Sequence, residues 1–166
     1  MSDVMLLAAI AAPLTLAIAA ILPAARPLVL RLAVIAPLPA LVLALLAPPS
    51  TLSEPWLIMG TVIGLDSVSK IFLAFTAILW AAAAATARRW MRGDVHATGF
   101  ITCFLLAMTG NIGLILAQDV FSFYALFALM SFASFGLVVH ARSDKAYSAG
   151  RLYIASVVAG ELALFA

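Results

Sequence analysis

The chain has few charged residues. Of its 166 residues, nine are Lys or Arg and seven are Asp or Glu, so charged residues make up 10% of the chain. Soluble domains usually contain about 25%. Hydrophobic residues account for 66% of the sequence. This composition excludes an ordinary soluble globule, and it predicts an all-α protein that crosses a membrane several times.

Cysteine and the motifs of common catalytic sites are also scarce. Cys103 is the single cysteine and lies in an apolar run, which excludes an internal disulfide and a cysteine-based metal cluster. The sequence has no recognisable phosphate-binding loop and no nucleophile with a nearby base. His96 and His140 lack partners at a metal-binding spacing. We therefore expect no catalytic site, cofactor or metal in this chain, and whether it is part of an enzyme stays open.

Hydrophobic runs separated by charged or Pro-rich stretches predict a bundle of six transmembrane spans in one domain. A spanning helix needs ~20 mostly apolar residues. The predicted spans are residues 4–22, 28–47, 68–87, 97–117, 120–140 and 152–166. The connection at 48–67 is rich in Pro and Gly and should not be a continuous helix, and Trp56 could anchor it at the membrane surface.

The last predicted span is short. Residues 152–166 would extend ~22 Å as a helix, less than the ~30 Å thickness of the hydrocarbon core. A helix that ended there would leave unpaired carbonyl groups inside the membrane. We therefore expect the chain to continue beyond Ala166 or to be completed by a partner.

The placement of the basic residues supports this topology. If the N-terminus is outside, every Lys and Arg except Lys70 falls in an inside connection. These residues are Arg26, Arg31, Arg88, Arg89, Arg92, Arg142, Lys145 and Arg151. Because basic connections are retained on the cytoplasmic side, the pattern predicts a multi-pass protein of the cell inner (plasma) membrane. Lipid headgroups explain the basic clusters better than nucleic acid does, so the expected partners are the bilayer and other membrane subunits.

Three charged residues lie at the outer ends of predicted spans. Asp66 and Lys70 are four residues apart at the start of the third span, and Asp119 opens the fifth. Both Asp residues suit the N-cap of a helix, and Asp66 and Lys70 are spaced to form an ion pair. The alternative is a role in the entry of ions.

Glu161 is the most deeply placed carboxyl group. It lies ten residues beyond Arg151, and hence ~15 Å into the membrane by helical rise. A carboxyl group at that depth must be protonated, hydrogen-bonded or in contact with water. Asn111, Tyr124 and Ser131 could form a proton path with it. Such polar groups can equally form ordinary hydrogen bonds between helices.

Three stretches of the sequence resemble one family of membrane proteins. They are GLDSVSKIFLAFTAILWAAAA (64–84), GNIGLILAQDVFSFYALFALMSFASFGLVVH (110–140) and AGRLYIASVVAGELALFA (149–166). They are similar to spans three to six of the antiporter-like subunits of respiratory complex I, of Mrp cation/proton antiporters and of membrane-bound hydrogenases. The resemblance implies a proton-conducting subunit of about fourteen spans with two inverted repeats of five helices. This chain would form its N-terminal part.

The sequence departs from this family at one informative position. Family members carry a glutamate in the fifth span that is thought to move protons together with lysines further along the chain. When the family motif is laid on residues 119–130, the glutamate position falls on Ala128. The acid of the family is therefore absent, and its lysine partner in span seven lies beyond the sequence.

Glu161 is our candidate for the missing carboxyl group. We expect it to face the interior of the bundle beside Tyr124, Ala128 or Asn111. Two functions are open: a proton- or cation-translocating subunit of a larger complex, and a non-conducting structural or scaffold subunit of the same family that docks a partner protein. A continuous polar chain between Glu161 and Asn111 would favour the first.

The shortest predicted connection fixes one pair of helices. Only Gln118 and Asp119 separate the fourth and fifth spans, so these two helices should be adjacent and antiparallel. We expect them to pack through Gly110, Gly113 and the face that bears Ala128 and Ser131.

Overall fold

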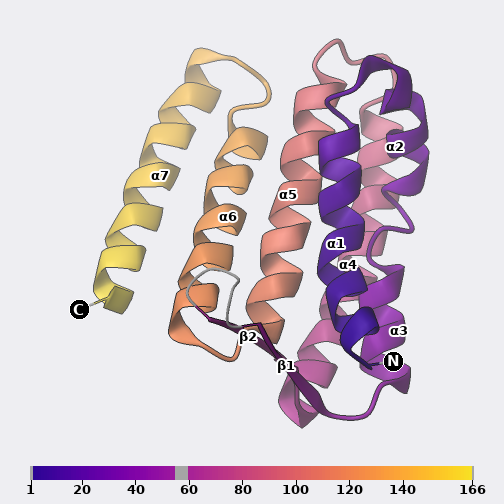
Figure 1. Cartoon of the computed structure of the whole chain (residues 1–166). Coiled ribbons are helices and arrows are strands. Elements are labelled where there is room, and N and C mark those ends of the chain that lie inside the picture. Colours follow the sequence, from indigo (N-terminus) through magenta and orange to yellow (C-terminus); the bar gives the residue numbers. More distant parts are fainter. Residues whose placement is uncertain (1, 55–59, 166) are drawn as a thin grey trace.

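The computed structural model describes residues 2–54 and 60–165, and it shows a helix bundle with one small β-hairpin (Figure 1). The helices are α1 (Ser2–Ala19), α2 (Arg26–Leu32), α3 (Leu38–Leu46), α4 (Ser67–Trp90), α5 (Ala97–Leu116), α6 (Val120–Val138) and α7 (Asp144–Phe165). A short 3-10 helix at Pro23–Ala25 precedes α2, and strands β1 (Ser50–Glu54) and β2 (Thr61–Leu65) form the hairpin.

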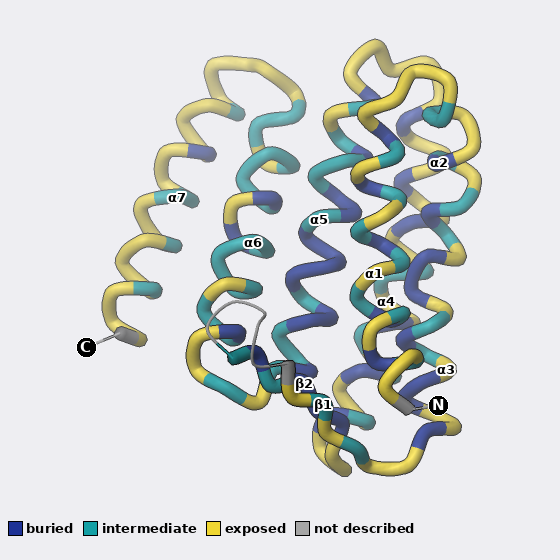
Figure 2. Tube along the Cα trace, in the orientation of Figure 1, coloured by how far each residue is buried: buried dark blue, intermediate teal, exposed yellow. Residues whose placement is uncertain are grey.

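Helix α5 is the centre of the bundle. It contacts α1, α4, α6 and strand β2, and Figure 2 shows it as a mostly buried helix. Leu105, Met108, Ile112 and Leu116 on α5 are completely buried. Helix α7 lies at the edge of the bundle, packs mainly on α6 and is largely exposed (Figure 2). The outer helices therefore present their apolar side chains to the surroundings, as expected of helices that face lipid.

The prediction of six spans is not supported. Within 2–54 and 60–165, three helices are long and apolar enough to cross a membrane, namely α4, α5 and α6. Residues 3–19 and 23–32 provide a fourth span if they are counted together, although they are bent by 116°. The structure therefore supports a membrane protein with three or four candidate spans.

Proline explains why the second predicted span fails. The run at 28–47 is divided into α2, which ends at Leu32, and α3, which begins at Leu38. Pro37 is the N-cap of α3, and Pro39 lies in its first turn. A proline lacks the amide donor that a helix interior needs but is tolerated in a first turn, so two prolines here favour a helix that begins at this point over one that continues through it.

The last helix begins earlier than predicted. Helix α7 starts at Asp144 instead of residue 152 and contains 22 residues, or ~33 Å at the helical rise. The hydroxyl of Ser143 accepts a hydrogen bond from the amide of Ala146 at 3.2 Å, as an N-cap does. The prediction of a short final helix was therefore wrong, because the charged residues before position 152 belong to the helix.

The β-hairpin corrects the all-α prediction. Strands β1 and β2 are antiparallel, with Ser50 opposite Leu65. The absence of a continuous helix at 48–67 is confirmed, but paired strands were not expected. The amide of Gln118 donates to the carbonyl of Val62 at 2.9 Å, which ties the hairpin to the α5–α6 connection. Trp56, the predicted interfacial anchor, lies outside the described residues.

The basic connections share one end of the bundle. The α1–α2, α4–α5 and α6–α7 connections lie together at the top of Figure 1, and the hairpin and the α5–α6 turn lie at the opposite end. We call these the basic end and the hairpin end. The hairpin end carries Asp66 and Asp119. This arrangement agrees with the charge alternation in the sequence, and the outside position of the N-terminus stays a prediction.

Helices α5 and α6 form the closest contact in the bundle. A Cβ atom added to Gly110 would lie 2.6 Å from the backbone nitrogen of Met130, and one added to Gly113 would lie 2.7 Å from Leu126. The antiparallel pair and the role of both glycines are confirmed. The opposing face of α6 was wrongly predicted, because Leu126 and Met130 meet α5 instead of Ala128 and Ser131.

Replacing Gly110 by Ala should destabilise the protein by ~1–3 kcal/mol, because backbone atoms of α6 must move to admit the methyl group. Gly99→Ala is the matched control on the same helix, since nothing lies within 4 Å of its added Cβ. The control should be neutral or stabilising by up to ~1 kcal/mol. Thermal unfolding in detergent measures both variants, and equal unfolding temperatures would contradict the close α5–α6 contact.

Asp119 should hold the hairpin on the bundle, because its Oδ2 accepts a hydrogen bond from the amide of Val62 at 2.8 Å. We expect Asp119→Ala to increase hydrogen exchange at the Val62 amide and to lower stability by ~1–2 kcal/mol through loss of the α6 cap. Asp66→Ala is the control, because Asp66 caps α4 at Ser69 without contacting the hairpin strands by a side-chain hydrogen bond. Unchanged exchange at Val62 in Asp119→Ala would refute the link.

Candidate functional site

Glu161 lies on the face of α7 that packs against α6. Gly150 on the same face is buried against Phe135 and Val139, and the hydroxyl of Tyr153 donates to the carbonyl of Ser131 at 3.4 Å. Glu161 follows Gly150 by eleven residues, or three turns of a helix. It is partly buried, and its Oε1 is buried without a hydrogen-bond partner in the described part of the chain. The structure therefore places this carboxyl group at the α6–α7 interface.

The packing of α6 on α7 sets the depth of Glu161. Leu164 lines a pocket with Val120 and Tyr124, so Glu161, one turn earlier on α7, is level with Tyr124. Tyr124 lies five residues after Asp119, or ~7 Å from the hairpin end of α6. Glu161 is therefore closer to the hairpin end than the mid-membrane depth that was expected from its ~15 Å rise beyond Arg151. That estimate counted from a residue that already lies inside α7.

Ala128 and Ser131 lie on the side of α6 that faces α7. Leu126 faces α5, and Ala128 is two residues further, about 200° around the helix. Ser131 is 3% exposed and its carbonyl meets Tyr153 of α7. The predicted neighbours Tyr124 and Ala128 and the proton-path candidate Ser131 therefore share the interface that contains Glu161, with Ala128 about one turn deeper than the carboxyl group.

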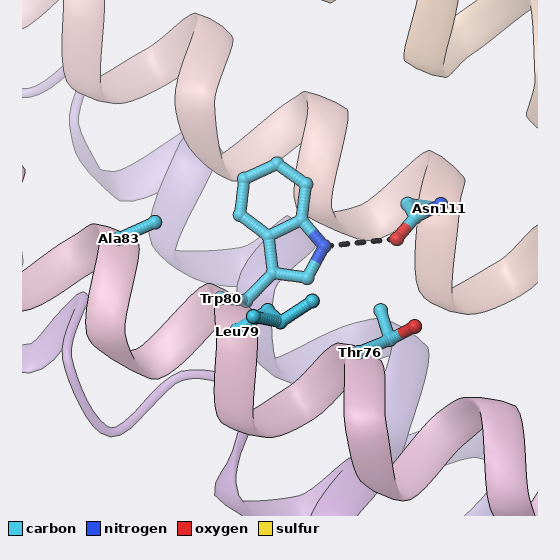
Figure 3. Close-up of a pocket in the computed structure, with 5 residues that line it drawn as sticks. All are labelled: Thr76, Leu79, Trp80, Ala83 and Asn111. Atoms are coloured by element: carbon cyan, nitrogen blue, oxygen red, sulfur yellow. Dashed lines mark hydrogen bonds between the residues drawn. The ribbon is translucent and has the colours of Figure 1, made fainter.

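Asn111 belongs to a second polar group, which connects α4, α5 and α6. The Nε1 of Trp80 donates to the Oδ1 of Asn111 at 2.9 Å (Figure 3), and the Nδ2 of Asn111 lies 3.4 Å from the Sδ of Met130. Phe104 packs edge-on against Trp80 at 4.9 Å between ring centroids. Thr76, Leu79 and Ala83 line a pocket beside the Trp80 and Asn111 pair (Figure 3).

The two polar groups do not join. Asn111 contacts Met130 on the α5 side of α6, whereas Glu161 lies on the α7 side. Within 2–54 and 60–165, Asn111 and Glu161 share no hydrogen bond. The predicted position of Glu161 beside Asn111 is therefore wrong, because α6 separates them.

Asp66 and Asp119 are helix caps, as their positions predicted. The Oδ1 of Asp66 accepts from the amide of Ser69 at 2.6 Å, and the Oδ1 of Asp119 accepts from the amide of Ser122 at 2.7 Å. Hydrogen bonds from Ser69 hold the pKa of Asp66 below its usual value. Burial opposes ionisation of Asp119, but hydrogen bonds from Ser122 and Val62 outweigh it and its pKa is also lowered.

The expected ion pair between Asp66 and Lys70 is not present among the described residues. The backbone amide of Lys70 donates to the carbonyl of Asp66 at 3.0 Å, as in an ordinary helical turn. The Asp66 carboxylate is instead engaged with Ser69. The structure therefore supports the capping role of Asp66 more directly than a pairing with Lys70.

Asp94 was not predicted from the sequence, although it connects two loops at the basic end. Its Oδ1 accepts from the amide of His96 at 2.6 Å, and its Oδ2 lies 3.1 Å from the Nε2 of His140. These contacts lower the pKa of Asp94, the His96 amide contributing most and His140 next. The sequence separation of 46 residues between Asp94 and His140 explains why no local pattern indicated this pair.

Removing the donor on Trp80 should weaken the contact between α4 and α5. Trp80→Phe keeps an aromatic ring beside Phe104 but leaves the Oδ1 of Asn111 without its partner, at a cost of ~1–3 kcal/mol. Trp90→Phe is the control, because Trp90 is 81% exposed. Thermal unfolding in detergent compares the two variants, and an equal effect would show that the hydrogen bond adds nothing to stability.

Comparison with known proteins reveals a similarity to an antiporter component. No family model matches the chain. The chain is 34% identical over 97 residues, or 58% of its length, to a probable K(+)/H(+) antiporter subunit of Rhizobium meliloti (strain 1021). The match spans 17% of the length of that protein. This similarity supports the resemblance to antiporter-like membrane subunits that the sequence motifs indicated.

Proposed function

We propose that this chain is part of a membrane subunit of a proton- or cation-translocating complex, related to complex I and to Mrp antiporters. The relative with 34% identity is named as a K(+)/H(+) antiporter subunit. The apolar helices α4, α5 and α6 are suited to a multi-pass position in the cell inner (plasma) membrane. Other membrane subunits of the complex would be its partners.

The position of Glu161 is the observation that carries this proposal. A carboxyl group at an interface between helices in lipid costs several kcal/mol unless it finds a partner, water or a proton. The buried Oε1 of Glu161 has no hydrogen-bond partner among the described residues. A group in that situation is suited to accept and release a proton.

Tyr124 and Ser131 complete the proposed proton path. Both lie on the α7 side of α6, on either side of Ala128 along the helix. The small side chain of Ala128 leaves space where the related proteins carry their glutamate. A proton path along the α6–α7 interface therefore uses Glu161, about one helical turn from the position of Ala128 where the fifth-span acid is missing, and Asn111 is outside this path.

A non-conducting scaffold subunit is the second candidate, and the separation of the two polar groups favours it. Asn111 is engaged with Trp80 and Met130, as expected of a structural hydrogen bond between helices. The described residues do not provide a polar chain that crosses the bundle from Asn111 to Glu161. In this alternative, Glu161 binds a polar group of a neighbouring subunit.

Replacing Glu161 by Gln tests the proton path, because it keeps the size of the side chain and removes the titratable proton. The variant is measured in the assembled complex in inverted membrane vesicles, where a pH-sensitive dye reports proton movement driven by a potassium gradient. We expect at least a ~10-fold loss of rate, since a positioned proton-transfer group contributes about 100-fold or more. Glu161→Asp should retain part of the activity.

Asp144→Asn is the matched control. Asp144 is a carboxyl group on the same helix, but it is exposed in the first turn at the basic end. This variant should transport like the unmodified complex. If Glu161→Gln assembles normally and transports at the same rate as Asp144→Asn, the proton path is refuted and the scaffold function is the better account.

A further inference from the structure

A pocket at the basic end gathers three arginines, from α2, from the last turn of α4 and from the turn that follows α4. Arg31 in the last turn of α2 lines it together with Arg88 and Arg92 near the end of α4. Helix α4 ends at Trp90, so Arg88 lies in its last turn and Arg92 in the turn that follows it, and both line the same pocket. The positive groups of α2 and α4 therefore converge on one place.

These arginines have no acidic partner in the described part of the chain. The one ion pair found there joins Asp94 and His140. Asp94 is the acidic residue closest in sequence to Arg92, and its two oxygens are engaged with His96 and His140. The Nε of the nearby Arg26 is buried without a hydrogen-bond partner. The pocket thus has a surplus of positive charge, and Arg26, next to the lining residue Pro27, has an unpaired buried donor.

The remaining side chains of the pocket are apolar. Pro27, Leu30 and Met91 line it with the arginines. Leu28 and Trp90 are sequence neighbours of the lining residues Pro27 and Met91, and they are 55% and 81% exposed. An exposed tryptophan at the end of an apolar helix is typical of the headgroup level of a bilayer. The surroundings therefore suit a molecule with a charged group and an attached apolar part.

We propose that this pocket binds the phosphate group of an anionic phospholipid in the leaflet at the basic end. Guanidinium groups bind phosphate oxygens through paired, charge-assisted hydrogen bonds. Anionic lipids are enriched in the cytoplasmic leaflet and are attracted by clustered basic residues. The apolar side chains of the pocket contact the glycerol and the start of the acyl chains, which a free phosphate ion lacks.

Bound lipid would also connect two helices that make few other contacts. Helix α2 packs mainly on α1 and the short helix that precedes it. A phosphate shared by Arg31 and by Arg88 or Arg92 would fasten α2 to the end of α4. The proposal depends on the membrane location of the chain but is independent of proton movement through Glu161.

The test compares lipid binding by arginine variants of the full chain, purified within its complex. Native mass spectrometry counts retained phosphatidylglycerol while its concentration is varied. We expect at least a ~10-fold loss of phosphatidylglycerol affinity in the triple variant Arg31→Gln, Arg88→Gln, Arg92→Gln. Each basic residue near a membrane surface contributes about fivefold to the affinity for anionic lipid. Phosphatidylcholine and glycerol 3-phosphate are the comparison ligands, and both should bind weakly to the unmodified protein.

Arg89→Gln is the matched control, because Arg89 lies in the same helical turn as Arg88 but does not line the pocket. It should change phosphatidylglycerol binding less than twofold. If the triple variant fails to fold, Arg88→Gln alone should still weaken binding more than Arg89→Gln does.

Three results would overturn the lipid site. They are equal losses in Arg88→Gln and Arg89→Gln, equal binding of phosphatidylcholine, and glycerol 3-phosphate binding as strong as that of the lipid. Proton movement measured in the same variants separates this proposal from the proposed function. If the triple arginine variant loses lipid binding but still transports protons, the lipid site is supported. If the Glu161→Gln complex binds lipid normally but does not transport protons, the proton path is supported and the lipid site is independent of it.

Discussion

The need to satisfy every backbone hydrogen bond within the chain shapes this bundle. In lipid, an unpaired amide or carbonyl costs several kcal/mol, so an apolar chain must form helices wherever it meets the hydrocarbon. Within 2–54 and 60–165, the longest non-helical stretches lie at the hairpin end, where β1 and β2 pair with each other. The carboxylate of Asp119 accepts hydrogen bonds from two backbone amides at this end, that of Ser122 at the start of α6 and that of Val62 in β2.

Helix packing then decides which polar groups can act together. Gly110 and Gly113 allow α6 to lie directly on α5, with Leu126 and Met130 between them. That contact directs the opposite face of α6 toward α7, and with it the residues near Glu161. Asn111 lies on the other side of α6, where it is hydrogen-bonded to Trp80. Helix α6, held against α5 at the two glycines, therefore separates the two polar groups.

Local features of the fold could be predicted from the sequence, and long-range ones could not. The caps at Asp66 and Asp119 depend on an amide three residues away, and the α5–α6 pair depends on a connection of three residues. Pro37 carried a usable signal for the break between α2 and α3, which hydropathy alone ignores. The face of α6 could not be assigned, because apolar side chains occur on every side of this helix. The contacts of Asp119 with Val62 and of Asp94 with His140 join distant segments, so no periodicity reveals them.

The separation of charge between the two ends has a consequence for insertion in an energised membrane. With the hairpin end outside, Asp66 and Asp119 must cross the bilayer during assembly, whereas Arg88, Arg92 and Arg142 stay behind. A membrane potential that is negative inside drives acidic groups outward and holds basic groups inside, at about 2.3 kcal/mol per unit charge for each 100 mV. The potential across a respiring membrane would therefore help to orient this protein before any partner binds it.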